Sequence, residues 1–207
     1  MSYSEKVVYF IQMNLSETVF YFNEDMKKHT TFQTGGNADL LVEPGTIPEL
    51  QKLINYISKE NIPYMIIGQG SNIIVSDKGL RQVVIKIGKR LSRCTIENEK
   101  LEAEAGALLA DVAKEAQENS LSGLEFASGI PGSIGGGVFM NAGAYGGEIK
   151  DVLQEILVLT AGGELLIRKI SELELGYRTS MMQTNGDIVL RAEHCKAPWY
   201  KGKYRGI

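Results

Sequence analysis

The chain has 207 residues, of which 43% are hydrophobic and 23% are charged, and its formal net charge at pH 7 is −3. This composition is typical of one large globular domain or two small lobes, and it does not indicate a nucleic-acid-binding surface. Residues 1–10 show no basic segment followed by an apolar core, which predicts a cytoplasmic protein. Residues 126–147 carry no charged side chain, but eight of them are glycine, so we do not expect a membrane span.

Helix and strand patterns alternate in the first part of the chain. Apolar residues recur at helical spacing after Thr46, a residue type favoured at helix N-caps, and Pro48 falls in the first turn. In order, the patterns predict a helical lead-in within 1–28, a strand at 39–43, a helix at 47–61, a strand at 64–67, an extended run at 73–75 and a strand at 83–87. This order is typical of a small α/β unit.

The pattern changes beyond residue 88. It predicts a hairpin from 93–97 and 101–105, a helix at 108–119, a second hairpin from 155–159 and 164–167, and a last strand at 187–192. We therefore divide the chain into a helical lead-in (1–28), a first α/β lobe (29–88), a second α/β lobe (89–195) and a divergent basic and aromatic tail (196–207).

Two glycine-rich segments lie at the ends of predicted strands. Gly68-Gln69-Gly70-Ser71-Asn72 could point successive N–H groups into one hollow that binds phosphate oxygens, although by itself a plain β-turn explains it better. It matches neither the Rossmann nor the Walker fingerprint.

The second segment runs from Gly129 to Gly147. Its glycines would allow a flat ring or a pyrophosphate to approach the backbone, or they could simply be a tightly packed crossing between strands. Two such segments on one chain favour a large phosphate-containing ligand.

A third segment, Gly176–Ser180, holds Tyr177 and Arg178. Arginine offers a planar fork of donors to an oxyanion, but five residues alone are weak evidence for a site. The two histidines, His29 and His194, do not stand in a metal-ligand spacing, so no metal site is expected, and His194 is expected at the surface.

Together these segments resemble the UDP-N-acetylenolpyruvoylglucosamine reductase family. The resemblance covers about residues 29–193, and its motifs occur in the order of the family: "HTTFQTGGNADLLVEP" (29–44), "IIGQGSNIIVSDKGLRQVVI" (66–85), "GLEFASGIPGSIGGGVFMNAGAYGGEI" (123–149) and "LGYRTS" (175–180).

The resemblance implies an α+β, two-lobed FAD-binding fold of the vanillyl-alcohol-oxidase (PCMH) type, with the flavin held between the lobes. It implies FAD-binding roles for two groups of residues: Gly68, Gln69, Gly70, Ser71 and Asn72 at the pyrophosphate, and Ser128, Gly129, Ile130, Pro131, Gly132, Ser133 and Gly135 along the rest of the cofactor.

The family reaction uses NADPH to reduce the flavin, which then reduces the enolpyruvyl group of a sugar nucleotide in peptidoglycan precursor synthesis. By resemblance, Arg178 would polarise the substrate carboxylate and Tyr177 would help to place the substrate. The family also carries a third domain that supplies the proton donor, and no residue of this chain resembles it. Full turnover is therefore expected to be weak or absent, and a flavin-binding module or an altered, empty pocket are the alternatives. The oligomeric state is left open.

Overall fold

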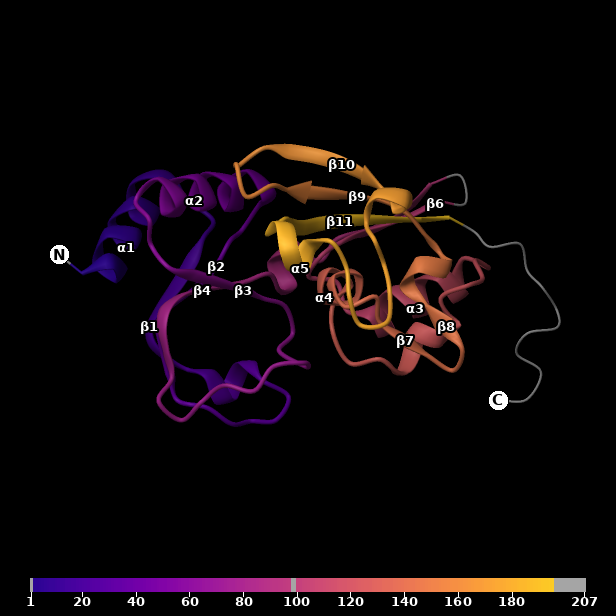
Figure 1. Ribbon diagram of the computed structural model, residues 1–207, viewed down its shortest axis with the longest axis horizontal. Helices are drawn as coiled ribbons and strands as arrows, with labels where there is room; N and C mark the ends of the chain where they lie inside the picture. Colours follow the sequence, from indigo (N-terminus) through magenta and orange to yellow (C-terminus); the bar gives the residue numbers. More distant parts are fainter. Residues whose placement is uncertain (1, 98–99, 196–207) are drawn as a thin grey trace.

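Two lobes lie side by side, each built on its own β-sheet (Figure 1). The computed structural model of the chain describes residues 2–97 and 100–195. The divergent tail assigned to residues 196–207 lies outside the described residues.

The first lobe carries a four-stranded sheet in the order β1-β2-β4-β3. Strands β2, β4 and β3 are parallel, and β1 pairs antiparallel with β2. Its elements are α1 (Tyr3–Asn14), β1 (Val19–Asp25), the 3₁₀ turn η1 (Met26–His29), β2 (Asn37–Glu43), α2 (Ile47–Lys59), β3 (Tyr64–Ile67) and β4 (Leu80–Lys86).

Helix α2 forms as the sequence predicts. The Thr46 side chain accepts a hydrogen bond from the Glu49 backbone N–H at 3.3 Å, and Pro48 lies at the start of the helix, where a missing N–H costs nothing. The apolar face, made of Leu50, Leu53, Ile54 and Ile57, is fully buried. These residues belong to the same buried cluster as Leu40 of β2 and Val83 of β4, so the helix packs on one face of the first sheet.

The second lobe carries a five-stranded antiparallel sheet in the order β10-β9-β11-β6-β5. Helices α3 and α4 lie below this sheet in Figure 1. Its elements are η2 (Lys89–Leu91), β5 (Cys94–Glu97), β6 (Lys100–Glu104), α3 (Leu109–Glu118), η3 (Glu125–Gly129), α4 (Ile134–Phe139), β7 (Gly143–Ala144), β8 (Gly147–Glu148), η4 (Ile149–Asp151), β9 (Leu153–Leu159), β10 (Leu165–Lys169), η5 (Ile170–Glu172), α5 (Met182–Asn185) and β11 (Ile188–Cys195).

One hydrophobic core runs through both lobes. Leu50 and Ile85 of the first lobe belong to the same buried cluster as Leu101 and Ile156 of the second. A smaller cluster around Met26 and the far face of the first sheet is separate. The lobes are thus continuous at their junction.

Three segments differ from the sequence prediction. Residues 1–28 contain the expected helix, α1, but also the unexpected strand β1, whose residues Tyr21 and Phe22 are exposed at a sheet edge and so break the usual alternation. Residues 73–75 form an irregular segment and not a strand. The expectation that His194 lies at the surface is wrong, because it is 2% exposed within β11, where it pairs with Leu101.

Within the described residues, no helix has both the length and the apolar character needed to cross a membrane.

Candidate functional site

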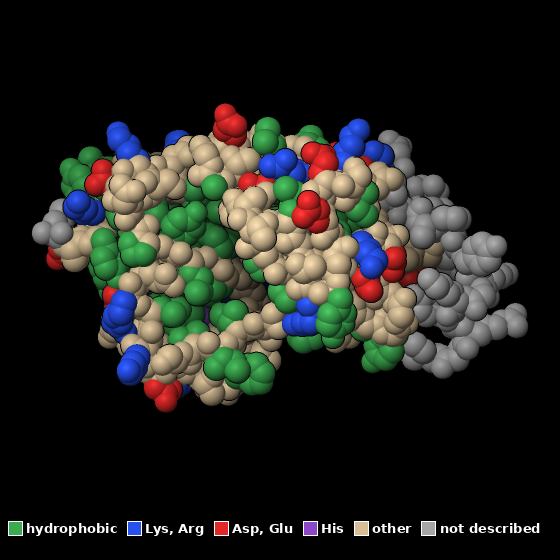
Figure 2. Space-filling model, in the orientation of Figure 1, with side chains coloured by type: hydrophobic (Ala, Val, Ile, Leu, Met, Phe, Trp, Pro, Cys, Tyr) green, Lys and Arg blue, Asp and Glu red, His purple; other side chains and the backbone are tan. Residues whose placement is uncertain are grey.

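A cavity of about 710 Å³ lies between the two lobes. This volume is in the range of small-molecule and cofactor sites, roughly 300–1,000 Å³. Figure 2 shows the hollow from outside, with hydrophobic side chains on its inner surface. The first lobe contributes β3 and the loop that follows it, and the second contributes α4, the start of β11 and the segments before them.

The two glycine-rich segments meet at the floor of this cavity. A Cβ added to Gly68 would lie 2.5 Å from the Ser133 hydroxyl, and one added to Gly132 would lie 3.0 Å from the Ser71 hydroxyl. Gly132 also has φ +138°, which side-chain-bearing residues rarely adopt. Backbone without side chains therefore lines both sides of the floor.

Gly70 is required by the backbone conformation of the Gly68–Asn72 loop. Its φ is +71°, and an added Cβ would lie 1.9 Å from the carbonyl oxygen of His29. The Thr31 N–H donates to the Gly70 carbonyl at 3.1 Å. The Gly68–Asn72 loop is thus seated on the backbone of residues 29–31, which explains why these two sequence motifs occur together.

Ser133 is the most unusual polar group of the cavity. The residue is 2% exposed, and its hydroxyl has no hydrogen-bond partner among the described residues. A buried hydroxyl without a partner costs about 1–3 kcal/mol. Because Ser133 lines the cavity, a ligand with polar oxygens at the floor would satisfy this hydroxyl.

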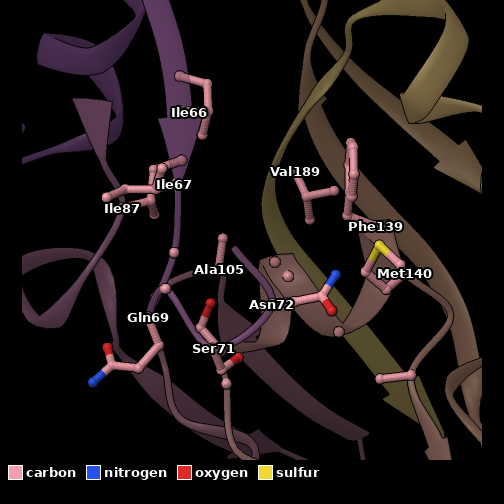
Figure 3. A pocket seen from close by; sticks show the side chains of 18 of the residues that line it. Ile66, Ile67, Gln69, Ser71, Asn72, Ile87, Ala105, Phe139, Met140 and Val189 are labelled. Carbon is pink, nitrogen blue, oxygen red and sulfur yellow. The ribbon is translucent and has the colours of Figure 1, made fainter. Parts of the chain in front are cut away.

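One end of the cavity has two apolar walls that face each other. Tyr64, Ile66 and Ile87 come from the first lobe, and Ile188 and Val189 come from β11. In Figure 3, Ile66, Ile67 and Ile87 stand opposite Val189 and Phe139 across the gap. A flat, weakly polar ring would fit between such walls.

Arg178 joins the two lobes at the cavity. Its Nη2 donates to the Oδ1 of Asn72 at 2.7 Å. The turn that presents it is closed by a backbone bridge between Gly176 and Thr179, and Arg178 itself has φ +52°. A non-glycine residue in this region is strained, and such strain is retained where the surrounding structure requires it.

The charge in the cavity is low. Of the described residues that line it, only Arg178 and Asp187 carry a charge, and Asp187 is buried and accepts a hydrogen bond from Arg168 Nε at 2.9 Å. Burial raises the pKa of the Tyr64 phenol above its usual value, so this wall stays uncharged. No group of acidic, histidine or cysteine side chains that could hold a metal ion occurs within residues 2–97 and 100–195.

The structure brings most of the predicted site residues together. Those that line the cavity are Gly68, Gln69, Gly70, Ser71, Asn72, Ile130, Pro131, Gly132, Ser133, Gly135 and Arg178. The amide of Gln69 points away from the gap in Figure 3, whereas Asn72 points across it.

Three predicted site residues lie outside the cavity wall. Ser128 and Gly129 end η3, where the Ser128 hydroxyl donates to the Glu125 carbonyl at 2.8 Å. Tyr177 is 90% exposed.

Gly135 does line the cavity, but its lack of a side chain also has a packing reason, because an added Cβ would lie 2.8 Å from the Cβ of Ala105.

The apolar wall residues were not anticipated. Ile66 and Val189 lie in hydrophobic strands. The sequence alone does not distinguish strand residues that line a cleft from strand residues that lie in the core. The one available signal was that a glycine-rich segment follows β3 directly.

Residues 38–167 match the family described as FAD binding domain. The chain is 51% identical over 170 residues to a protein of Syntrophomonas wolfei named UDP-N-acetylenolpyruvoylglucosamine reductase, with 82% of this chain and 57% of the relative covered. It is 49% identical over 194 residues to the protein of the same name from Alkaliphilus oremlandii, with 93% and 62% covered. The chain thus spans about three fifths of the length of these curated relatives.

Solved structures agree. The crystal structure of UDP-N-acetylenolpyruvylglucosamine reductase from Thermus caldophilus matches with a TM-score of 0.72 at 33% identity, covering 87% of this chain and 63% of that one. Alkyldihydroxyacetonephosphate synthase matches with a TM-score of 0.67 at 16% identity, covering 94% and 40%, which concerns the fold alone. The predicted α+β, two-lobed FAD-binding fold of the vanillyl-alcohol-oxidase type is confirmed, and the chain belongs to the FAD binding domain family.

Proposed function

We propose that the cavity between the lobes binds FAD and that the chain is the flavin-binding part of a UDP-N-acetylenolpyruvoylglucosamine reductase. The observation that carries this proposal is the meeting of two bare-backbone segments beside the unpaired hydroxyl of Ser133. Backbone N–H groups and hydroxyls without intervening Cβ atoms suit the oxygens of a pyrophosphate. The 710 Å³ cavity and its apolar walls suit the rings of a dinucleotide.

The residues divide by the part of the cofactor they would hold. Gly68–Asn72 and Ile130–Ser133 would surround the pyrophosphate, and the facing walls of Ile66 and Val189 would cover a ring. Gly135 lines the same cavity and would contact the cofactor through its backbone, whereas Ser128 and Gly129 would act only through the position of η3.

When bound, FAD supplies the hydride relay of this family, from NADPH to the enolpyruvyl double bond of UDP-N-acetylenolpyruvoylglucosamine. The chain's own contribution is charge stabilisation at the substrate. Arg178 lies at the cavity with its guanidinium fixed by Asn72, and it would bind the substrate carboxylate, where negative charge develops. Tyr177, exposed beside it, would contact the sugar nucleotide from the solvent side.

The proton that completes the reduction needs a positioned acid, and we assign this role to no described residue. A second function is therefore kept: a flavin-binding module that exchanges electrons with NADPH without reducing the sugar nucleotide. The relatives' additional length favours keeping this alternative. The proposed setting for either function is the cytoplasm, with a sugar nucleotide and NADPH as small-molecule partners.

Titration of the purified chain with FAD tests the proposal. Binding should perturb the flavin absorption band at about 450 nm and raise the melting temperature of the chain, because a ligand that binds only the folded state stabilises it. Bleaching of the band by NADPH, followed by recovery on addition of the enolpyruvyl substrate, supports the reductase. Bleaching without recovery supports the flavin-binding module, and the absence of any FAD binding contradicts both.

A further inference from the structure

The turn that presents Arg178 lies in an irregular segment between η5 and α5. We call residues Gly176–Thr179 the arginine turn. The Gly176 N–H donates to the Thr179 carbonyl at 3.1 Å, and the Thr179 N–H donates to the Gly176 carbonyl at 3.4 Å. These bonds fix the shape of the turn but not its position, and Arg178 within it is exposed and strained at φ +52°. Other contacts must therefore place the turn at the cavity.

Gln183 of α5 holds the arginine turn from one side. Its Nε2 donates to the Arg178 carbonyl at 3.1 Å and to the Phe139 carbonyl at 3.1 Å. A glutamine amide carries two N–H groups, so one is available for each carbonyl. The Ser180 hydroxyl donates to the same Phe139 carbonyl at 2.7 Å. The residue that bears the guanidinium is thus joined to the end of α4.

Asn141 holds the arginine turn from the other side. It is 4% exposed, and its Nδ2 donates to the Gly176 carbonyl at 2.9 Å and to Glu148 Oε2 at 2.7 Å. Its Oδ1 accepts a hydrogen bond from the Lys150 N–H at 3.0 Å. Both N–H groups and the carbonyl oxygen of the amide therefore have partners. The contacts with Glu148 and Lys150 orient the amide, and the bond to Gly176 reaches 35 residues along the chain.

Both anchors belong to the segment that forms the second-lobe wall of the cavity. Phe139, Met140 and Ala142, on either side of Asn141, line the cavity. In Figure 3 Phe139 and Met140 lie on the side toward which Asn72 points. Among the described residues that line the cavity, neither Asn141 nor Gln183 occurs. The two amides thus fix the arginine turn to the wall without occupying the cavity.

We propose that Gln183 and Asn141 are positioning residues that hold the guanidinium of Arg178 at the cavity. They act by fixing the arginine turn to the end of α4 and to the segment that follows it. The consequence for substrate binding rests on the proposed function, whereas the placement of the guanidinium does not. A carboxylate that arrives there meets a donor already in place, so less conformational freedom is lost on binding.

Nuclear magnetic resonance of the chain without FAD tests the placement. With isotope-labelled arginine, the Arg178 Nε–H signal, assigned by its loss in Arg178→Lys, should report a guanidinium with hindered rotation. Gln183→Met keeps the length of the side chain but removes both N–H donors, so the signal should shift toward that of free arginine. Gln51→Met is the matched control, because the Gln51 amide donates to the distant Gly163 carbonyl at 2.9 Å, outside the cavity lining, and its loss should leave the signal unchanged.

Asn141→Asp is a second variant for the same measurement. Aspartate has the same shape but presents an oxygen in place of Nδ2 to the Gly176 carbonyl and the Glu148 carboxylate, so the Arg178 signal should shift in the same direction. Asn61→Asp is its control, because Asn61 also has a positive φ, +53°, but is exposed at the end of α2.

The two variants decide the placement together. Asn141 is buried, whereas Gln183 is exposed, so Gln183→Met decides alone if Asn141→Asp does not fold. A freely rotating Arg178 guanidinium in the parent chain overturns the proposal. So does a signal that shifts in neither variant, or that shifts equally in the controls.

Binding of the enolpyruvyl substrate to the FAD-loaded chain tests the consequence. Followed through the flavin absorption, substrate affinity should fall about fivefold in Gln183→Met, the equivalent of one hydrogen bond, with FAD affinity nearly unchanged. In an Arg178→Ala background the same change should cost nothing further, because no guanidinium is left to place. An equal loss in that background shows that Gln183 acts independently of Arg178 and overturns the positioning role. If the parent chain binds no FAD, the proposed function fails, and the resonance measurement without FAD still decides the placement.

Discussion

Asn72 and Arg178, 106 residues apart in the sequence, are joined by a hydrogen bond of 2.7 Å from Arg178 Nη2 to Asn72 Oδ1. Asn72 ends the glycine-rich loop of the first lobe, and Arg178 stands at the tip of a turn from the second. The bond holds a charged donor at the mouth of the cavity, where a substrate would meet a bound flavin.

Changing Arg178 to Ala tests the role of this donor. Any enolpyruvyl reduction by the enzyme should fall by roughly 10²-fold or more, as when an oxyanion donor is removed. Binding of FAD should change little, because the cradle at the floor is intact. Single-turnover kinetics measure the first effect and absorption titration the second. An unchanged reduction rate contradicts the role given to Arg178.

Ser133→Ala should move stability and ligand affinity in opposite directions. Without ligand, the variant should melt at the same or a higher temperature, because a buried hydroxyl without a partner is removed. Its affinity for FAD should fall about tenfold, the equivalent of one hydrogen bond. Ser128→Ala is the control, since that exposed hydroxyl lies outside the cavity wall and should affect neither quantity appreciably. A lower melting temperature with unchanged affinity would indicate a purely structural serine.

Gly68→Ala and Gly129→Ala form a matched pair. The new methyl group at residue 68 would lie 2.5 Å from the Ser133 hydroxyl at the cavity floor, whereas at residue 129 it would meet nothing within 4 Å. FAD affinity should therefore fall at least tenfold for Gly68→Ala and remain near that of the parent chain for Gly129→Ala. Isothermal titration of the two variants measures the difference, and similar affinities would argue against a ligand at the floor.

His194 should make the folded state sensitive to mild acid. Burial lowers the pKa of its imidazole from 6.5 to about 4. As the pH falls below 6.5, this histidine becomes protonated in the unfolded chain but stays neutral in the folded chain. The free energy of unfolding therefore decreases between about pH 6.5 and pH 4, by about 3 kcal/mol in total. Urea unfolding at several pH values measures the slope.

His194→Leu should flatten that part of the pH dependence. His29→Gln is the control for the other histidine, whose ring nitrogens contact Glu24 Oε1 and Lys86 Nζ at 3.0 Å each. If the slope persists in His194→Leu, another group causes it.

Glu49 should stabilise the fold through its charge. Burial disfavours ionisation, but hydrogen bonds from the Glu17 N–H at 3.0 Å and the Thr18 hydroxyl at 2.7 Å outweigh it and lower the pKa of the carboxyl. Glu49→Gln should cost about 1–3 kcal/mol of unfolding free energy at pH 7. This advantage should be present above the unfolded pKa of about 4.5 and disappear as pH falls through the lower folded value.

Glu118→Gln provides the comparison for Glu49. The Glu118 carboxylate lies 3.7 Å from Lys114 on an exposed helix face, and surface pairs of this kind contribute less than about 0.5 kcal/mol. Equal losses in the two variants would mean that burial of Glu49 adds nothing.

Local chemistry made much of the fold predictable. The cap of α2 at Thr46 and the hairpin of β9 and β10 follow from residue type and spacing, whereas the placement of both glycine-rich loops at one cavity was implied by the resemblance to the family. Strand β1 was missed because Tyr21 and Phe22 point to opposite faces of the sheet and are both exposed, so the alternation of buried and exposed residues is lost.

Some features of the site could not be predicted from the sequence because they depend on how the two lobes pack against each other. Asn72 meets Arg178 only because both sheets share one core, and no local pattern predicts a contact across 106 residues. The role of Ser128 was implied by the resemblance to the family and stays a prediction; the η3 turn directs its hydroxyl to the Glu125 carbonyl, a local contact that the sequence did not reveal. His194 was expected at the surface because it was assigned to the divergent end of the chain, whereas it lies within β11 and is buried.

The continuous core has a consequence for how the chain would take up its cofactor. Ile85 of the first lobe and Ile156 of the second belong to one buried cluster, so a hinge opening of the two lobes would expose apolar surface to water. A dinucleotide would therefore enter a cavity whose width is already set by the shared core. Heating should melt both halves in a single cooperative step, with or without the flavin in place.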